Sequence, residues 1–196
     1  MGSLCRPGIV VTSYHVIRNM EKGKIRLVGG QIKGSRILRI TAVLAIDERA
    51  DLALLGVLDA KRAGIPTLPL AADKAVIGET IYTFGSPEGL SGTMSPGIIA
   101  AGLRVFNGRP LLQILTPISR GSSGGPVVDS RGQVVGIAVG SLTEGQNLNF
   151  AVPESLIASL VHRWASGKSG SFAIIWDLFE PSGEDNWTWL ASVHVP

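Results

Sequence analysis

The chain has 196 residues, of which 45% are hydrophobic and 17% are charged, and it contains 25 glycines and 11 prolines. This length is enough for one large domain or two small fused ones, and so few charges exclude a disordered chain. Its single cysteine, Cys5, excludes an intrachain disulfide and a thiolate metal cluster. Because only three histidines are spread along the chain, we expect no metal site and no cofactor.

In chain order, the dominant pattern is short runs rich in Val and Ile that are separated by turns containing glycine. These runs predict strands at Ile9–Thr12, Ile25–Val28, Ile37–Ile46, Leu52–Val57, Thr80–Phe84, Ile98–Leu103, Leu111–Thr116, Val127–Asp129, Val134–Val139 and Leu148–Val152. Strands at this spacing indicate an all-β sandwich or barrel.

The C-terminal part of the chain follows a different pattern. Pro153 and Glu154 precede a run with helical periodicity, which predicts a helix over Ser155–Val161. No run approaches the roughly twenty apolar residues that a membrane-spanning helix needs. The aperiodic loop Asp59–Asp73 is predicted to connect two halves, which divides the chain into residues 1–72, residues 73–163 and a Trp-rich tail, residues 164–196. We expect this tail to pack on the second half; an oligomer contact or a non-native extension is the alternative.

The most specific motif is Gly121-Ser122-Ser123-Gly124-Gly125-Pro126. In a tight turn, a serine between glycines can expose its hydroxyl while backbone N–H groups converge on one point, which is the geometry that stabilises an oxyanion. Gly121 can adopt a positive φ that turns its peptide toward the same point as the N–H of Ser123. An ordinary turn between strands is the alternative interpretation.

Two further residues fit the same chemistry. His15 follows the apolar run Val10–Thr12, and Asp51 immediately precedes the apolar run Leu52–Leu55. A surface histidine and a turn aspartate are the ordinary interpretations of each. A serine nucleophile needs a base, however, and the base needs a carboxylate that fixes its tautomer. Together the three residues favour a His-Asp-Ser triad.

The motifs resemble those of the trypsin-like (chymotrypsin-fold) serine peptidases, and within them the HtrA/DegP group. The resemblance covers about Pro7 to about Leu160. It rests on the histidine strand Val11–Val16, the Asp-x-x-x-Asp-Leu-Ala segment Asp47–Leu55, the activation loop and following strand Phe84–Leu90 and Thr93–Ile99, the serine motif, and the closing strand Asn147–Pro153.

This resemblance implies two antiparallel Greek-key β-barrels with a C-terminal helix, and no PDZ domain follows within these residues. Since the family has strands before the histidine strand, we expect the first barrel to lack its N-terminal strand or strands. The resemblance also implies that Ser123 is the nucleophile, that His15 is the base and then the acid, and that Asp51, rather than Asp47, orients it. The N–H groups of Gly121 and Ser123 would form the oxyanion hole.

Ser122 occupies the position at which digestive relatives carry an aspartate that pairs with a newly cleaved N-terminus. This favours control by movement of the loop Gly85–Gly97 over activation by N-terminal processing. The specificity pocket is expected to be lined by Pro117, Ile118, Ala138, Val139 and Gly140, with Ser141 next to them. None of these residues is acidic, which predicts a preference for small or medium apolar side chains. The alternative is that they only pack the barrel.

We therefore expect a serine endopeptidase acting on polypeptides, with unfolded proteins as the substrates that the resemblance implies. A catalytically silent peptidase-fold module that binds peptides is the alternative. A nucleic-acid binder using the basic segment 18–39 is weaker, because no aromatic residue is interleaved with the basic ones. Assembly into a homo-oligomer stays open.

Overall fold

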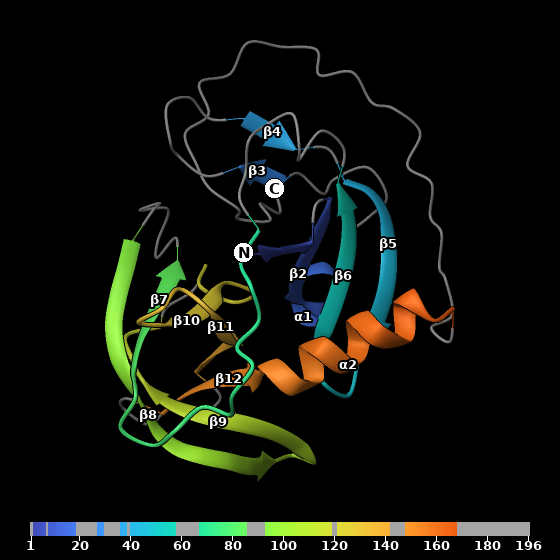
Figure 1. The fold of residues 1–196 in the computed structure, drawn as a ribbon. Coiled ribbons are helices and arrows are strands. Elements are labelled where there is room, and N and C mark those ends of the chain that lie inside the picture. Colours follow the sequence, from blue (N-terminus) through green and yellow to red (C-terminus); the bar gives the residue numbers. More distant parts are fainter. Residues whose placement is uncertain are drawn as a thin grey trace.

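A computed structural model of the protein describes residues 2–6, 8–18, 27–29, 36–38, 40–57, 67–85, 93–118, 121–141 and 148–167. Strands dominate the described part (Figure 1). The elements are β1 (Gly2–Arg6), β2 (Ile9–Ser13), α1 (Tyr14–Ile17), β3 (Leu27–Gly29), β4 (Arg36–Leu38), β5 (Ile40–Asp47), β6 (Leu52–Val57), β7 (Thr80–Gly85), β8 (Thr93–Phe106), β9 (Arg109–Leu115), β10 (Pro126–Asp129), β11 (Val134–Ser141), β12 (Asn149–Pro153) and α2 (Glu154–Ala165).

The strands form one closed barrel and one open sheet. In the second half of the chain, six antiparallel strands close in the order β10-β11-β12-β9-β8-β7. In the first half, the described strands form a sheet in the order β1-β2-β6-β5, while β3 and β4 pair with each other. The prediction of an all-β fold with a C-terminal helix is confirmed at this level. Figure 1 shows the barrel in green, yellow and orange beside the sheet in blue and teal.

Several elements differ from the sequence prediction. Strand β8 extends to Phe106 because it forms a long hairpin with β9 through Asn107 and Gly108, which both have positive φ. Strand β1 and the one-turn helix α1 are not predicted by any pattern in the sequence. The single strand expected at Ile37–Ile46 corresponds to two, β4 and β5. Of the loop expected at Gly85–Gly97, Gly85 ends β7 and Thr93 begins β8, and residues 86–92 lie outside the described residues.

The largest core cluster lies where the sheet, the barrel and α2 meet. Strand β2 contributes Ile9 and Val11 to this cluster and Val10 to a second one, as expected for a strand whose alternate side chains point to opposite faces. Inside the barrel a third cluster includes Ile81 and Ile114. Both faces of the first sheet are therefore covered at β2, and the strand is buried along its whole length.

Helix α2 links the barrel to the first sheet. It begins at Glu154, directly after β12 ends, and it packs on β5 and β6 as well as on β11 and β12 (Figure 1). The side chains of Ile157 and Leu160 are fully buried, and burial of each contributes about 1.5–3 kcal/mol. Trp164, where the predicted tail begins, lies in this helix and packs against the core. Residues 168–196 lie outside the described residues, and the division into domains stays a prediction.

Neither helix in the described part of the chain has both the length and the apolar composition needed to cross a bilayer.

Candidate active site

His15 lies at the end of a buried strand. Strand β2 has five buried residues and ends at Ser13, and the chain then turns into α1. The backbone N–H of Tyr14 donates to the carbonyl of Asp51 at 3.0 Å, which fixes the start of α1 against the β5–β6 turn. The side chain of His15 is about one-third exposed. The scaffold therefore holds its backbone while leaving the ring accessible from solvent.

Asp51 contacts His15 with both carboxylate oxygens. Oδ1 accepts the backbone N–H of His15 at 2.8 Å, and Oδ2 lies 2.6 Å from the ring Nδ1. A carboxylate only accepts hydrogen bonds, so Nδ1 carries the proton in this pair. The lone pair on Nε2 is then available to take a proton from another group. The sequence prediction placed Asp51 beside His15, and this is where the structure has it.

Asp51 itself has an unusual backbone. Its φ is 57°, in the left-handed region that aspartate tolerates better than most residues. Its side chain is only 6% exposed. Asp47, the other acid of the motif, has different partners. Its carboxylate accepts hydrogen bonds from the backbone N–H of Ala50 and from the guanidinium of Arg163. The contacts thus separate the two acids into different roles.

Ser123 lies in the turn that precedes β10 and is half-buried. Gly121 has a φ of 96°, which a residue with a side chain rarely adopts. After the serine, the N–H of Gly124 donates to the carbonyl of Ala138 at 2.7 Å, and the N–H of Ala138 donates to Gly125 at 2.9 Å. The turn is therefore attached to β11.

The histidine strand and the serine turn meet at one carbonyl group. The hydroxyl of Ser13 donates to Ala138 O at 3.4 Å, and the N–H of Gly124 donates to the same oxygen. Ser13 is two residues before His15, and Gly124 directly follows Ser123. His15 and Ser123, the two members of the predicted triad that are farthest apart in the sequence, are thus attached through their neighbours to the same peptide group of β11.

A cavity of about 110 Å³ lies beside Ser122, the residue before Ser123. Its described lining residues are uncharged: Thr83, Gly85, Thr93, Ser95, Pro117, Ile118 and Ser122. Two of the residues predicted to form the specificity pocket, Pro117 and Ile118, are among them. Ala138 and Val139 instead pack in core clusters. The assignment of Gly140 and of the whole set to a specificity pocket stays a prediction.

Gly85 approaches Ser122 so closely that a side chain at position 85 would force Ser122 to shift. A Cβ atom built on Gly85 would lie 2.5 Å from Oγ of Ser122, which is itself 5% exposed. Glycine at this position therefore permits β7 to pack against Ser122. The sequence motif includes Gly85 but gives no indication of its contact with Ser122. The hydrogen bond from the hydroxyl of Ser13 to Ala138 is likewise not predicted by any motif.

Tyr14, next to His15, is held by the same turn. Its hydroxyl donates to Oε1 of Glu48 at 3.1 Å. This hydrogen bond, with a smaller effect of burial, raises the pKa of the Tyr14 hydroxyl above its usual value. The tyrosine therefore stays a neutral hydrogen-bond donor at neutral pH and adds a further contact between α1 and the turn that carries Asp51.

Fold and site together define a class of protein, the trypsin-like peptidases, and the comparisons with known proteins agree. A family model described as "Trypsin-like peptidase domain" matches residues 1–137, and the chain belongs to this family. Homologues of the HtrA/DegP group cover most of the chain.

Among these relatives, "Serine protease HTRA2, mitochondrial" from Bos taurus is 30% identical over 80% of this chain and 34% of its own length. The "Periplasmic serine endoprotease DegP" from Salmonella typhimurium is 32% identical over 78% of this chain and 32% of its own length. A solved structure, that of the serine endoprotease from Yersinia pestis, matches with a TM-score of 0.71 and 26% identity, over 86% of this chain and 58% of the other. The chain spans about a third of the length of the curated relatives it matches.

Proposed function

We propose that the protein is a serine endopeptidase that hydrolyses peptide bonds in polypeptides. The observation that carries the proposal is the pair formed by His15 and Asp51, in which the carboxylate accepts both the backbone N–H and the ring Nδ1 of the histidine. Membership in the trypsin-like peptidase family and similarity to two serine proteases support it.

In the proposed mechanism, Oγ of Ser123 attacks the carbonyl carbon of the substrate while its proton passes to Nε2 of His15. Asp51 stabilises the imidazolium, and the N–H groups of Gly121 and Ser123 hold the oxyanion. The imidazolium then protonates the leaving amine. Departure of the amine leaves an acyl-enzyme on Ser123. Water then attacks its carbonyl carbon while His15 takes a proton from the water and afterwards returns it to Oγ of Ser123, which restores the serine and releases the carboxylic acid.

The proposed substrates are unfolded polypeptides with small or medium apolar side chains at the cleaved position. The similarity to a serine protease and a serine endoprotease supports polypeptides as the class of substrate, and the preference for unfolded ones is what the resemblance to the HtrA/DegP group implies. The uncharged cavity beside Pro117 and Ile118 supports the apolar preference. As part of the same proposal, the sheet β1-β2-β6-β5 belongs to a first barrel, and Ser123 lies between this sheet and the closed second barrel.

A fluorophosphonate probe tests the proposal directly, because it reacts only with an activated serine. We expect the probe to label the wild-type protein and the protein to cleave casein at neutral pH, while Ser123→Ala abolishes both and leaves the circular dichroism spectrum unchanged. Ser122→Ala is the matched control, since it removes the adjacent hydroxyl. Labelling that survives Ser123→Ala would refute the assignment, and peptide binding without turnover would favour the silent module.

A further inference from the structure

The turn that carries Asp51 is held from both of its ends. Asp47 ends β5, and its Oδ1 accepts the N–H of Ala50 at 2.9 Å; the N–H of Asp51 donates to the carbonyl of Glu48 at 3.3 Å. Asp51 has a positive φ, and this backbone conformation costs free energy in a residue with a side chain. The Asp47 carboxylate is therefore part of what keeps Asp51 in place.

A residue on a distant helix binds the other oxygen of Asp47. Nη2 of Arg163, on α2, lies 2.6 Å from Oδ2, a short charge-assisted hydrogen bond. The second terminal nitrogen of Arg163 donates to Oγ of Ser159 at 3.0 Å, one helical turn earlier. The guanidinium is thus fixed to its own helix at one end and to the Asp51 turn at the other.

Helix α2 belongs structurally to the barrel that carries Ser123. It continues from β12, β12 pairs with β11, and the peptide of Ala138 on β11 binds the glycines that follow Ser123. A continuous path therefore runs from the serine turn, through β11 and β12, along α2 to Arg163 and Asp47. It ends at the turn that positions Asp51 and, through it, His15.

We propose that Arg163 is a positioning residue for the His15–Asp51 pair and that it acts through Asp47. This inference rests on the proposed peptidase function. The side chains of Arg163 and Asp47 are 40% and 23% exposed, and ion pairs of this exposure add little to stability. Geometry near reacting atoms is far more sensitive, because a displacement of about 1 Å lowers a rate by as much as about 100-fold. The contact therefore affects turnover more than stability.

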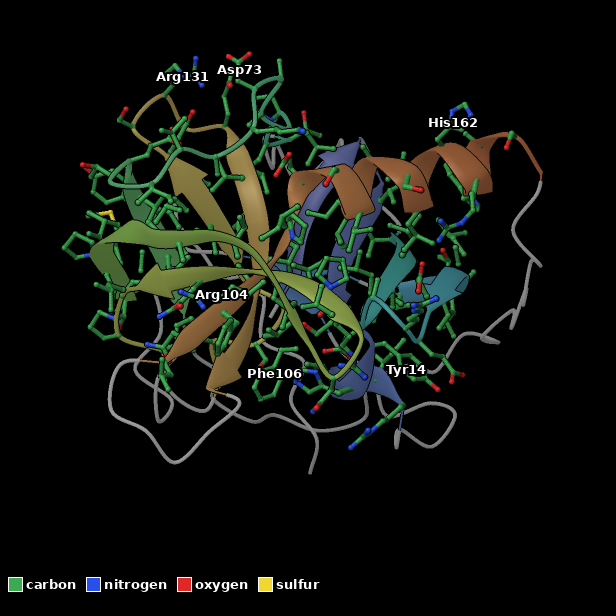
Figure 2. The ribbon with its side chains drawn as sticks, turned by 90° about the horizontal axis from the view of Figure 1, so that it is seen from below. Tyr14, Asp73, Arg104, Phe106, Arg131 and His162 are labelled. Carbon is green, nitrogen blue, oxygen red and sulfur yellow. The ribbon has the colours of Figure 1, made fainter. Side chains whose placement is uncertain are left out.

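The test uses the full chain, four single variants and one double variant. Arg163→Met removes the charge and keeps most of the side-chain length. Asp47→Asn keeps an oxygen for the N–H of Ala50 but offers Arg163 an amide in place of Oδ2. Arg163→Lys restores a cation, and His162→Gln changes the neighbouring exposed residue on α2, whose side chain points away from the core (Figure 2).

For Arg163→Met and for Asp47→Asn we expect kcat on a peptide substrate to fall about tenfold. We expect KM to stay within about twofold and Tm within about 4 °C of the wild-type values. Arg163→Lys should recover most of the rate, and His162→Gln should keep all of it. In the double variant Asp47→Asn/Arg163→Met, the second substitution should add no further loss.

A second readout does not depend on turnover. The low-field proton resonance of the His15 ring N–H that faces Asp51 should broaden or shift in Arg163→Met and stay unchanged in His162→Gln. If the wild-type protein is labelled at Ser123 and Arg163→Met matches it in kcat and in this resonance, the inference about Arg163 is wrong while the peptidase function stands. If the wild-type protein is not labelled at all, the peptidase function and the inference that rests on it are both overturned.

Discussion

Asp51 binds His15 at two points, the backbone N–H at 2.8 Å and the ring Nδ1 at 2.6 Å. Replacing the carboxylate by an amide keeps an oxygen for the backbone contact and turns an N–H₂ toward the ring. The ring must then accept at Nδ1 and carry its proton on Nε2, where it can no longer act as a base. This contact therefore predicts the effect of the Asp51→Asn substitution.

We expect Asp51→Asn to lower kcat by about 10⁴-fold. Hydrolysis of a peptide substrate and the second-order rate of fluorophosphonate labelling measure the effect. Asp73→Asn is the matched control, because the carboxylate of Asp73 is 82% exposed and Asp73 lies on the opposite side of the molecule from Tyr14, the neighbour of His15 (Figure 2). A loss of less than tenfold in Asp51→Asn would contradict the orienting role.

Gly85→Ala should disturb Ser122, the residue before the proposed nucleophile Ser123. The new Cβ would lie 2.5 Å from Oγ of Ser122, and overpacking of this kind costs about 1–3 kcal/mol of stability. We expect a lower urea midpoint and slower labelling of Ser123. Gly102→Ala is the control, because nothing lies within 4 Å of its Cβ position. Adding Ser122→Ala should relieve part of the defect; if it does not, another contact limits Gly85.

Asp129 gives a prediction for pH. Burial alone would raise the pKa of its carboxyl, but hydrogen bonds from the N–H groups of Gln133 and Arg131 and from the Arg131 side chain hold it below the usual 3.8. A lowered folded pKa means that the stabilisation is fully present above 3.8 and is lost as the pH falls through the folded value.

Accordingly, Asp129→Asn should reduce the free energy of unfolding by about 1–3 kcal/mol at neutral pH. This deficit should shrink in acid, at pH values of about 2 to 3. Urea unfolding at both pH values measures the difference. Asp73, which lies beside Arg131 at 3.9 Å (Figure 2), provides the control variant Asp73→Asn, which should change stability by less than about 0.5 kcal/mol. A deficit that stays constant with pH would rule out the lowered pKa as its origin.

Ile157→Ala should destabilise the protein through α2. The side chain of Ile157 is fully buried in the largest core cluster, and a truncation of this size costs about 2–5 kcal/mol. Ile77→Ala makes the same chemical change at a side chain that is 66% exposed, and it should change stability by less than about 0.5 kcal/mol. Thermal unfolding of both variants tests this, and equal Tm values would show that α2 adds nothing to the core.

Local patterns in the sequence predict most of the strands because apolar runs and glycine turns alternate so regularly. They miss β1, whose sequence Gly-Ser-Leu-Cys-Arg has no alternation and which forms only by pairing with β2. They shorten β8, because Pro96 and Gly97 precede the apolar run Ile98–Leu103 and Arg104 follows it, although pairing with β7 and β9 continues on both sides. Strand pairing thus overrides local propensity in both places.

For the candidate site too, sequence motifs predict some residues, while contacts between residues far apart in the chain are not predicted. His15, Asp51 and Ser123 can be proposed from sequence because each lies in a motif with a chemical reason for its residues. The contact between Arg163 and Asp47 cannot, since it joins residues 116 apart and neither one belongs to a motif that includes the other. The hydroxyl of Ser13 and the close approach of Gly85 to Ser122 likewise become visible only when the chain is folded.

The shared core cluster has a consequence for how the molecule melts. Ile9 and Leu54 from the first sheet, Val128 and Phe150 from the barrel, and Leu160 from α2 are buried in one cluster. Neither half keeps this interior once the other has opened, so heating should unfold them in a single cooperative transition with equal calorimetric and van't Hoff enthalpies. A ligand that binds the folded form of one half will then stabilise the other half against unfolding by the same free energy.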